Sequence, residues 1–528
     1  MFSGSLSSTF AVGTLGLAIA MAHGTAMADE PAAVAAADPS VRVDRVDFSG
    51  NRAFTSAQLS SLIASDIGKP MSLQAMRELA SKIQDYYHKA GYSLATVVVP
   101  AQDFAHMEAL KLTVLEGWLG RIDVRGNARY GTERVVAALN AAGVVQGKTF
   151  TLAQVEKGLT QLNRQSGIAV TSTLQPGKET GSTDLVVNVV ESPRISGSVE
   201  FNNYGSKNTG KNRLMPSVKF ADLTGRGDEL NALAMTAVGA GDLNYQYVSY
   251  ATPLNAIGTK LQAYFANGNV GVGREYEALN IKGDNKSLGV GIAQDFIRSS
   301  RTVFNAEAWL EAQNLKQEML DTTTAKDKIR KLRFGVGLDN TGLASRNLAA
   351  FGVQVGLGQG LGGMDDESLM SSRSYARADN SFTKLTLDLG RVQRITSRIS
   401  LIPRFSGQYS TKSLVSSEQW TIGGINSVAG FQPALFSGDS GFTASVEARY
   451  SLLSDDNRYQ LFTRIDHGRV YTRTPFLGQE RNNHLTGVTF GVLAEPIKAV
   501  DVRMDLAVPV GDKEGTSPVF FVQAQYHF

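Results

Sequence analysis

The sequence of 528 residues contains no cysteine, which excludes a disulfide framework and any thiolate metal or redox site. Its six histidines are scattered, and no two of them lie within four residues of each other, so a zinc site is not expected. Neither sign of charge is in excess, because 52 Lys and Arg residues accompany 49 Asp and Glu residues. A polybasic surface for nucleic acid is therefore excluded. We expect no metal, no cofactor and no nucleic-acid partner.

Long apolar runs are also missing. After residue 28 no stretch of eighteen apolar residues occurs, so the sequence predicts no membrane-spanning helix. Residues 11–22 form a short apolar run, and Ala26-Met27-Ala28 has the small-residue pattern of a cleavage site. We predict a secretory signal peptide over residues 1–28, although its first ten residues carry no Lys or Arg. A membrane anchor is the alternative, but the run is shorter than the ~20 residues that a span needs.

Residues 41–192 contain the same order of elements twice: strand, helix, helix, strand, strand. Residues 29–40 form a short segment before the first copy. That copy has strands at 41–48, 93–99 and 109–115 and helices at 55–65 and 72–89, with Met76, Leu79, Ile83 and Tyr87 on one helix face. The second copy has strands at 121–124, 169–175 and 183–190 and helices at 132–142 and 151–166. Two copies of about 75 residues each indicate two small domains.

Short motifs recur at fixed places in these copies. Gly50-Asn51-Arg52 and Gly126-Asn127-Ala128 follow the two first strands. More specific are Gly91-Tyr92-Ser93, Pro100-Ala101-Gln102-Asp103, and the alternating series from Leu110 to Glu116-Gly117. On these motifs the chain resembles the POTRA domains of two-partner secretion transporters (the TpsB family of haemolysin and adhesin secretion-activation proteins). The resemblance implies POTRA 1 at 41–118 and POTRA 2 at 119–192, both in the periplasm.

Residues 193–528 read as strands with one apolar and one polar face. Even positions from Phe442 to Leu452 are apolar, while the odd positions are Thr, Ser, Glu, Arg and Ser. Sixteen such strands begin near residues 194, 213, 228, 243, 257, 285, 300, 328, 346, 381, 398, 441, 458, 484, 499 and 517. An even number of strands with no helix to cover the polar face is typical of a transmembrane barrel. The predicted fold is α+β plus all-β: two β-α-α-β-β POTRA domains, then a 16-stranded antiparallel transmembrane β-barrel.

The lengths of the connections assign the two ends of this barrel. If the first strand starts on the POTRA side, every connection on that side is short. The connections at the other end include four long ones, at 269–284, 314–327, 359–380 and 410–440. We therefore expect the POTRA domains in the periplasm and the long loops at the cell surface of a bacterial outer membrane.

Loop 410–440 departs from the family that the chain resembles. That family has a Val-Arg-Gly-aromatic tetrad here, whose arginine meets an aspartate of a Phe-x-Asp motif on the inner wall. This chain has Val428-Ala429-Gly430-Phe431, and the wall motif reads Arg464-Ile465-Asp466. Alternation places Arg464 and Asp466 together on the inward face. We hypothesise that Arg464 neutralises Asp466 in place of the loop arginine; the alternative is that both groups are solvated in a wet channel.

Two further sets of residues are candidate functional sites. Edge strands can accept an extended polypeptide through unpaired N–H and C=O groups, so we expect substrate binding on the second strand of each copy. The candidates are Val170, Thr171, Ser172 and Thr173 in the second copy, next to the barrel, and Ala95, Thr96 and Val97 in the first. At the other end of the chain, Tyr526 and Phe528 resemble the C-terminal assembly signal of outer-membrane barrels.

Two motifs typical of enzymes occur in unsuitable places. Gly438-Asp439-Ser440-Gly441 matches a serine-protease nucleophile, but it ends a predicted surface loop without a His and Asp framework. Residues 358–363 fit G-x-G-x-x-G, yet they end a strand and open no helix. We therefore expect no enzymatic activity.

The resemblance implies a transporter that moves a large partner exoprotein from the periplasm to the cell surface through the barrel lumen. The alternative is an outer-membrane protein assembly factor of the same superfamily. Expected partners are the secreted exoprotein, outer-membrane lipid and, during biogenesis, the barrel assembly machinery, and the chain is expected to be a monomer. The residues do not identify the exoprotein.

Overall fold

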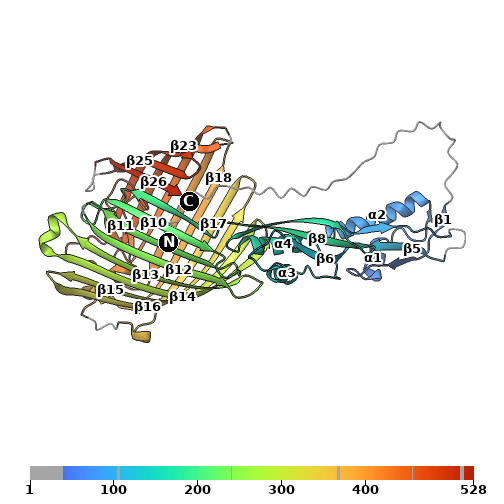
Figure 1. The fold of residues 1–528 in the computed structure, drawn as a ribbon, viewed down its shortest axis with the longest axis horizontal. Coiled ribbons are helices and arrows are strands. Elements are labelled where there is room, and N and C mark those ends of the chain that lie inside the picture. The colour runs from blue at the N-terminus through green and yellow to red at the C-terminus, as the bar shows by residue number, and fades with distance from the viewer. Residues whose placement is uncertain (1–39, 104–107, 240, 365–368, 455, 512–516) are drawn as a thin grey trace. The chain divides into compact units, whose positions relative to one another are not determined.

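A computed structural model describes residues 40–103, 108–239, 241–364, 369–454, 456–511 and 517–528 of the chain. It divides into two compact units, one ending at Glu191 and the other running from Ser192 to Phe528 (Figure 1). The predicted signal peptide at 1–28 and the segment at 29–39 lie outside the described residues and stay predictions.

The first copy in the N-terminal unit is a three-stranded sheet with two helices. Helix α1 (Ser56–Leu62) begins with a capping box, in which Thr55 and Gln58 each bind the other's backbone N–H. Helix α2 (Leu73–Lys89) is capped by Ser72 and buries the predicted stripe, which includes Ile83 and Tyr87. The sheet has the order β2 (Val46–Ser49), β5 (Leu110–Leu115), β4 (Thr96–Val98), with β2 and β5 parallel.

The second copy repeats this plan with longer strands. Helices α3 (Thr132–Ala141) and α4 (Leu152–Asn163) pack against a sheet with the order β6 (Trp118–Arg125), β8 (Ser182–Glu191), β7 (Ile168–Pro176). In both copies the central strand is the last of the copy, and the second strand, β4 or β7, lies at an edge.

The first copy differs from the sequence prediction at two strands. The expected strand 41–48 is divided into β1 (Val41–Arg42), which pairs with β3 (Pro70–Met71), and β2. The expected strand 93–99 is reduced to the three residues of β4. Its start is displaced because Tyr92 and Ala95 form a turn, in which the Ala95 N–H donates to the Tyr92 carbonyl.

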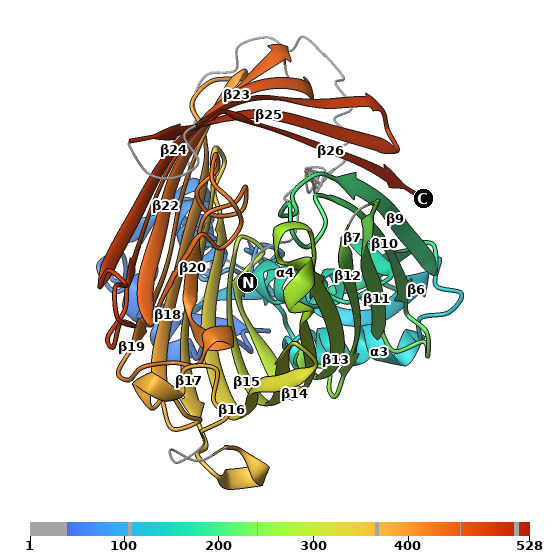
Figure 2. The ribbon, with the colours of Figure 1, turned by 90° about the vertical axis from the view of Figure 1, so that its left-hand side faces the viewer.

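The C-terminal unit is a closed antiparallel barrel of sixteen strands (Figure 2). Each strand begins within six residues of the position expected from the sequence, and the last strand pairs with the first to close the ring. The strands are β9 (Ile195–Asn202), β10 (Asn212–Ala221), β11 (Glu229–Val238), β12 (Asp242–Pro253), β13 (Thr259–Val272), β14 (Ile281–Ser299), β15 (Thr302–Met319), β16 (Thr322–Thr341), β17 (Ser345–Gly356), β18 (Thr383–Arg394), β19 (Ile399–Ser410), β22 (Ser440–Leu453), β23 (Asp456–Tyr471), β24 (Asn482–Ile497), β25 (Val500–Val510) and β26 (Val519–His527).

Two of the expected long loops are wrong. Residues 314–327 belong to the ends of β15 and β16, which are joined by a tight turn at Leu320 and Asp321. Half of residues 269–284 belong to the ends of β13 and β14, and the 3-10 helix η2 (Arg274–Leu279) lies between them. Strands β14 to β16 are therefore 18 to 20 residues long, well beyond the usual span of a bilayer. The long connections 357–382 and 411–439 are present as predicted.

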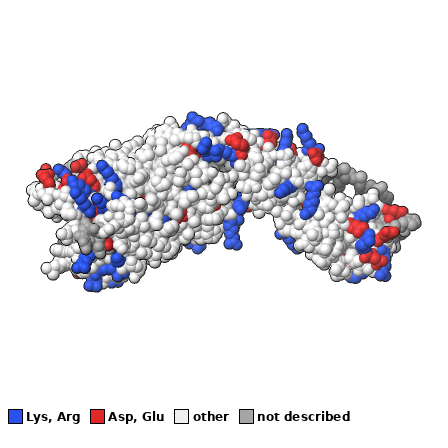
Figure 3. Space-filling model, turned by 90° about the horizontal axis from the view of Figure 1, so that it is seen from below, with Lys and Arg blue, Asp and Glu red and all other residues white. Residues whose placement is uncertain are grey.

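The two faces of the barrel wall carry different residues. Large apolar side chains are exposed on the outward face, for example Leu288, Val290 and Ile292 on β14 and Met504 and Leu506 on β25. A belt with few charged side chains separates the charged side chains at the barrel's ends (Figure 3). Charged residues in the middle of the strands, such as Glu447 of β22 and Asp505 of β25, are buried on the inward face. This alternation is what a wall between lipid and a polar lumen requires.

No helix in the described part of the chain is both long and apolar enough to cross a membrane.

Candidate functional site

The connection between β19 and β22, residues 411–439, folds inside the ring of strands, and we call it the inserted loop. It contains the 3-10 helix η5 (Ser416–Glu418) and a small hairpin of β20 (Trp420–Ile422) and β21 (Phe436–Gly438) (Figure 2). Ile422, Val428 and Phe431 of the loop form a buried cluster with the inward-facing Val470 and Leu485 of β23 and β24. The loop is thus packed on the inner wall.

The predicted tetrad Val428-Ala429-Gly430-Phe431 forms the contact between the inserted loop and this wall. All four positions are buried, and Ala429 clusters with Ile425 of the loop, Ala507 of β25 and Phe521 of β26. The wall is shaped for this approach, because a Cβ atom on Gly487 of β24 would collide with the Ala429 carbonyl oxygen. Backbone and wall therefore meet at a distance that only glycine permits.

Arg464 and Asp466 form an ion pair directly beneath the tetrad. The Arg464 Nε lies 3.0 Å from the Asp466 carboxylate, and both side chains are largely buried, with exposed fractions of 12% and 2%. Arg464 also donates from Nη2 to the Ile425 carbonyl of the inserted loop, at 2.9 Å. The Ala429 N–H points to Asp466 Oδ2 at 3.4 Å. The pair thus holds the backbone of the loop at Ile425 and Ala429.

Further ion pairs continue from this position along the inner wall. Arg449 of β22 lies 2.6 Å from Glu447, and Arg503 of β25 lies 2.9 Å from Asp505 and 3.7 Å from Glu447. The Arg503 guanidinium also lies over the ring of Phe462, 4.4 Å from its centroid. Every charge of this set has an opposite charge close by, which buried ions require.

A second attachment of the inserted loop is an ion-pair cluster around Glu418, on strands remote from β23. The Glu418 carboxylate lies 2.7 Å from Lys331 Nζ of β16 and 2.6 Å from Lys384 Nζ of β18, and its side chain is 2% exposed. Lys331 is also 3.6 Å from Glu311 of β15. This cluster has no signal in the sequence, because its members lie far apart in the chain.

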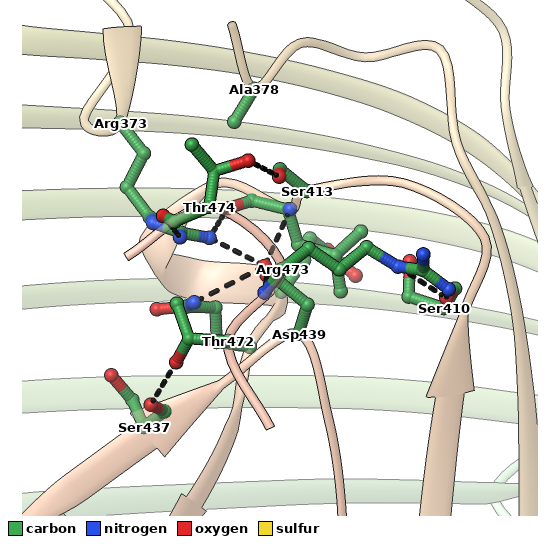
Figure 4. Close-up of polar contacts among 12 residues, drawn as sticks. Arg373, Ala378, Ser410, Ser413, Ser437, Asp439, Thr472, Arg473 and Thr474 are labelled. Carbon is green, nitrogen blue, oxygen red and sulfur yellow. Dashed lines mark hydrogen bonds and ion pairs between the residues drawn. The ribbon is translucent and has the colours of Figure 1, made fainter. Parts of the chain in front are cut away.

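The third attachment is the buried carboxylate of Asp439, where three outer loops meet (Figure 4). It accepts hydrogen bonds from Arg373 of loop 357–382 at 2.5 Å, from the Leu414 N–H at 2.8 Å, and from the Arg473 N–H of the β23–β24 connection at 2.8 Å. The Arg473 side chain donates to the Ser410 carbonyl, and the Ser410 N–H donates to Ser440 Oγ. The protease-like motif 438–441 is thus a structural junction, with its aspartate and serine both occupied.

In each copy of the N-terminal unit, a glutamate carboxylate accepts hydrogen bonds from backbone N–H groups directly after the Gly-Asn motif. We call this arrangement the clasp. Glu116 Oε1 accepts hydrogen bonds from the Arg52 and Ala53 N–H groups and from the Tyr87 hydroxyl. Gly50 has a φ of +81°, and a Cβ there would collide with the Val114 carbonyl. Burial and the Glu116 carboxylate together raise the pKa of Tyr87.

The second copy has the same clasp at Glu191. Its Oε1 accepts from the N–H groups of Ala128, Arg129 and Tyr130, and Arg129 Nε lies 2.7 Å from Oε2. Burial opposes ionisation of Glu191, but the Arg129 guanidinium and the three N–H groups outweigh it and lower the pKa to about 2. The clasp ties the last strand of the copy to the turn after its first strand.

The predicted substrate-binding residues lie on or beside the edge strands. Val170, Thr171, Ser172 and Thr173 all belong to β7, with Val170 buried and both threonines exposed on the opposite face. Thr96 and Val97 belong to β4, but Ala95 precedes that strand and its side chain is buried. Of the two edges, β7 is three times as long, with nine residues against three.

Tyr526 and Phe528 lie at the seam where the barrel closes. Tyr526 of β26 pairs with Val199 of β9, and its ring stacks on that of Phe528. The Phe528 backbone exchanges two hydrogen bonds with Gly197, of 2.9 and 3.0 Å. Their part in assembly stays a prediction.

A sixteen-stranded barrel with an inserted loop, preceded by β-α-α-β-β repeats, defines the class of POTRA-barrel outer-membrane proteins. The family model "Haemolysin secretion/activation protein ShlB/FhaC/HecB" matches residues 181–494, and the model "POTRA domain, ShlB-type" matches residues 41–117. The chain therefore belongs to the ShlB/FhaC/HecB family of haemolysin secretion/activation proteins. It is an outer-membrane transporter of the two-partner secretion type, with its POTRA domains in the periplasm.

Individual relatives agree with this family. The chain is 23% identical over 466 residues to the heme/hemopexin transporter protein HuxB of Haemophilus influenzae, covering 87% of this chain and 82% of that protein. It is 26% identical over 396 residues to the outer membrane transporter CdiB of Dickeya dadantii, covering 72% and 67%.

Solved structures show the same fold. CdiB from Escherichia coli matches with a TM-score of 0.76 at 19% identity, over 94% of this chain and 93% of that one. BamA from Haemophilus ducreyi, without its POTRA domains 1–3, matches with a TM-score of 0.54 at 12% identity, over 93% and 100%.

Proposed function

We propose that this transporter captures one large exoprotein in extended form on β7 and passes it through the barrel lumen to the cell surface. The observation that carries the proposal is the nine-residue edge strand β7, whose exposed face consists of uncharged residues such as Thr171 and Thr173. An edge strand of this length can add a strand from another polypeptide through main-chain hydrogen bonds. A transporter that must accept a long and varied sequence benefits from recognition that does not depend on side chains.

The inserted loop lies inside the barrel, and in this proposal its position regulates passage of the exoprotein through the lumen. Its tip is held on the wall by Arg464 and Asp466, and its base is held by Glu418 and Asp439. A chain passing through the lumen has to displace the tip, which is held by hydrogen bonds, whereas Glu418 and Asp439 form ion pairs. In this proposal Arg464 serves as the neutralising partner of Asp466 and as the holder of the loop.

The nature of the cargo follows from the relatives. HuxB is named a heme/hemopexin transporter, and another relative is named a hemolysin transporter, HpmB of Proteus mirabilis. We infer that the partner here is also a secreted protein and that the chain catalyses no reaction. We further infer that the chain works as a monomer surrounded by outer-membrane lipid, after insertion by the barrel assembly machinery.

Deletion of the gene tests the transport role against the assembly role. Loss of one large exoprotein from the medium, with an unchanged inventory of outer-membrane barrels, is the expected result. A broad loss of barrels from the outer membrane would instead assign the chain to barrel assembly.

Substitution Ser172→Pro tests capture on β7. Proline cannot donate a main-chain hydrogen bond, and the N–H of Ser172 points away from β8, so the sheet itself loses no hydrogen bond. We expect secretion to fall severalfold while the variant reaches the outer membrane at the normal level. Ser172→Val, which keeps the N–H, is the matched control and should secrete normally. Normal secretion by Ser172→Pro would contradict capture on this strand.

A further inference from the structure

The two edge strands differ in how their outward main-chain groups are occupied. Val97 of β4 pairs with Val114, and Val170 of β7 pairs with Val189, so the two valines occupy equivalent places in the two copies. In an antiparallel pair the residues alternate between those bonded to the neighbouring strand and those whose N–H and C=O point away. At both valines these groups point away from the sheet. The Val97 N–H meets a side chain of the preceding helix, and at Val170 both the N–H and the C=O do so.

The edge of the first copy is closed by three side chains. Gln84 of α2 accepts a hydrogen bond from the Val97 N–H at 3.1 Å, and the ring of His88 lies 2.8 Å from the Ala95 carbonyl oxygen. Where β4 ends, Gln102 continues the cover along β5, because its side-chain amide binds both the N–H and the C=O of Lys111, at 2.9 and 3.1 Å. Gln102 belongs to the Pro-Ala-Gln-Asp motif, so this motif has a physical role as an edge cap. A short edge with these caps offers little to an added strand.

In the part of the chain that the structure describes, the edge of the second copy is capped at one residue, Val170. Asn163, the last residue of α4, binds Val170 with both ends of its amide: Oδ1 accepts from the N–H at 2.7 Å, and Nδ2 donates to the carbonyl at 3.1 Å. The next outward groups belong to Ser172 and Leu174. Within the described residues, neither has a hydrogen bond from its outward main-chain groups to another part of the chain. The open part of the edge therefore starts directly after the Asn163 cap.

We propose that the exoprotein adds its strand to β7 at Ser172 and Leu174, and that Asn163 fixes one end of this docking segment. Gln84, His88 and Gln102 exclude the first copy, so the partner is directed to the second. This inference rests on the proposed capture function and specifies where on the periplasmic unit it takes place. An asparagine amide reproduces the donor and acceptor of a main-chain pair, and it therefore stands where the next residue of a bound strand would be.

The faces of β7 indicate the chemistry of the bound segment. Thr171, Thr173 and Gln175 form one exposed face without charge, whereas Leu174 lies on the other face and packs against the core of the copy. Cross-strand pairs favour β-branched and hydroxyl side chains opposite threonine. The partner is thus an uncharged extended segment with Thr, Ser or Val on one face and an apolar residue placed opposite Leu174.

Residue-resolved hydrogen exchange on the full-length protein in detergent tests this assignment. The probe is a synthetic peptide of alternating Thr and Val residues with a Lys at each end. In the unchanged protein we expect the peptide to slow exchange at the Ser172 and Leu174 amides by about tenfold, and to leave the Val170 amide, already protected, unchanged. In Asn163→Leu, the Val170 amide should exchange faster without peptide and become protected when peptide is added.

Control variants separate docking from simple stability. Asn140→Leu makes the same chemical change near the end of α3, where the side chain is exposed, and should leave all three amides as they were. Gln84→Leu together with Gln102→Leu should create a new response at Val97 and Lys111. Protection that appears on β4 of the unchanged protein, or at Val170 with Asn163 in place, would overturn the inference while leaving capture intact. Absence of any response on either edge would overturn capture itself.

Discussion

The guanidinium of Arg464 joins two parts of the barrel: it lies 3.0 Å from Asp466 on its own strand and 2.9 Å from the Ile425 carbonyl of the inserted loop. A substitution at this position therefore removes a counter-ion and a loop contact together. These two losses can be separated, because the loss of the counter-ion can be compensated by neutralising Asp466, whereas the loss of the loop contact cannot.

Arg464→Phe leaves the buried Asp466 carboxylate without its cation, and we expect a loss of stability of about 3 to 5 kcal/mol with a larger open-channel conductance. The double variant Arg464→Phe with Asp466→Asn removes the unpaired charge and should recover most of the stability but not the loop contact. Unfolding temperature and conductance in planar bilayers measure the two effects. If the single variant changes neither stability nor secretion, Arg464 is not the compensating residue.

The reverse exchange, Ala429→Arg with Arg464→Phe, introduces the residue pattern that the resemblance to two-partner secretion transporters implies. We expect it to recover secretion only in part, because Ala429 is fully buried against Ala507 and Phe521 and a longer side chain has to displace them. Secretion assays on this double variant and on Arg464→Phe alone provide the comparison. Equal secretion by the two would show that position 429 cannot take over the role.

Gly487→Ala should detach the tip of the inserted loop from β24, since the added methyl group would occupy the place of the Ala429 carbonyl. We expect a higher conductance and faster proteolysis of the loop in intact cells. Gly390→Ala is the matched control, because a Cβ on this strand residue of β18 has no neighbour within 4 Å. Identical behaviour of the two variants would contradict the close approach of loop and wall.

Asp439→Ala should loosen all three outer loops at once, because the carboxylate accepts from Arg373, Leu414 and Arg473. Removing a buried carboxylate that accepts several hydrogen bonds lowers the free energy of unfolding by about 3 kcal/mol or more. Trypsin cleavage in loop 357–382 on whole cells measures the loosening. Ser440→Ala, which changes the residue expected of a nucleophile, should retain secretion. If the unchanged protein had a peptidase activity that Ser440→Ala lacks, Ser440 would have to act as a nucleophile.

Glu191 gives the periplasmic unit a pH dependence at low pH. Its folded-state pKa of about 2 lies below the ordinary value of 4.5, so its contribution is complete above about pH 4.5 and is lost as the pH falls toward 2. We expect Glu191→Gln to lower the free energy of unfolding at neutral pH by about 1 to 2 kcal/mol, since solvent screens part of the interaction. The difference between the two proteins should shrink below pH 4.5. Urea titration followed by the helical circular dichroism signal measures it, and a difference that is constant down to pH 2 would argue against the clasp.

The parts that could be predicted from the sequence are those decided by neighbours in the chain. Strand alternation is local, and each barrel strand except at the seam and at the inserted loop pairs with the next one, so number and order followed from the pattern. Arg464 and Asp466 could be placed together because they are two residues apart on one strand.

What could not be predicted depends on contacts across the fold or on missing turn signals. Glu418 meets Lys331 across 87 residues, and Asp439 meets Arg373 across 66. The β15–β16 turn was overlooked because Leu320 and Asp321, with φ of +52° and +59°, occupy positions where Gly or Asn is the usual signal. The caps at Gln84 and Asn163 carry no sequence signal either, since an amide side chain on a helix can have many other partners.

The closing seam has a consequence for the order in which the barrel forms. Five residue pairs join β26 to β9, which are the last and the first strand of the barrel in the sequence. The inserted loop is enclosed by the closed ring of strands. If β9 and β26 paired first, the inserted loop would have to enter the closed barrel through its open end. The simpler sequence of events is that the loop settles on β23 to β25 while the sheet is still open. The inserted loop would then pack on the inner wall before the barrel closes. Substitutions that weaken this packing would slow the folding of the barrel, before any exoprotein binds.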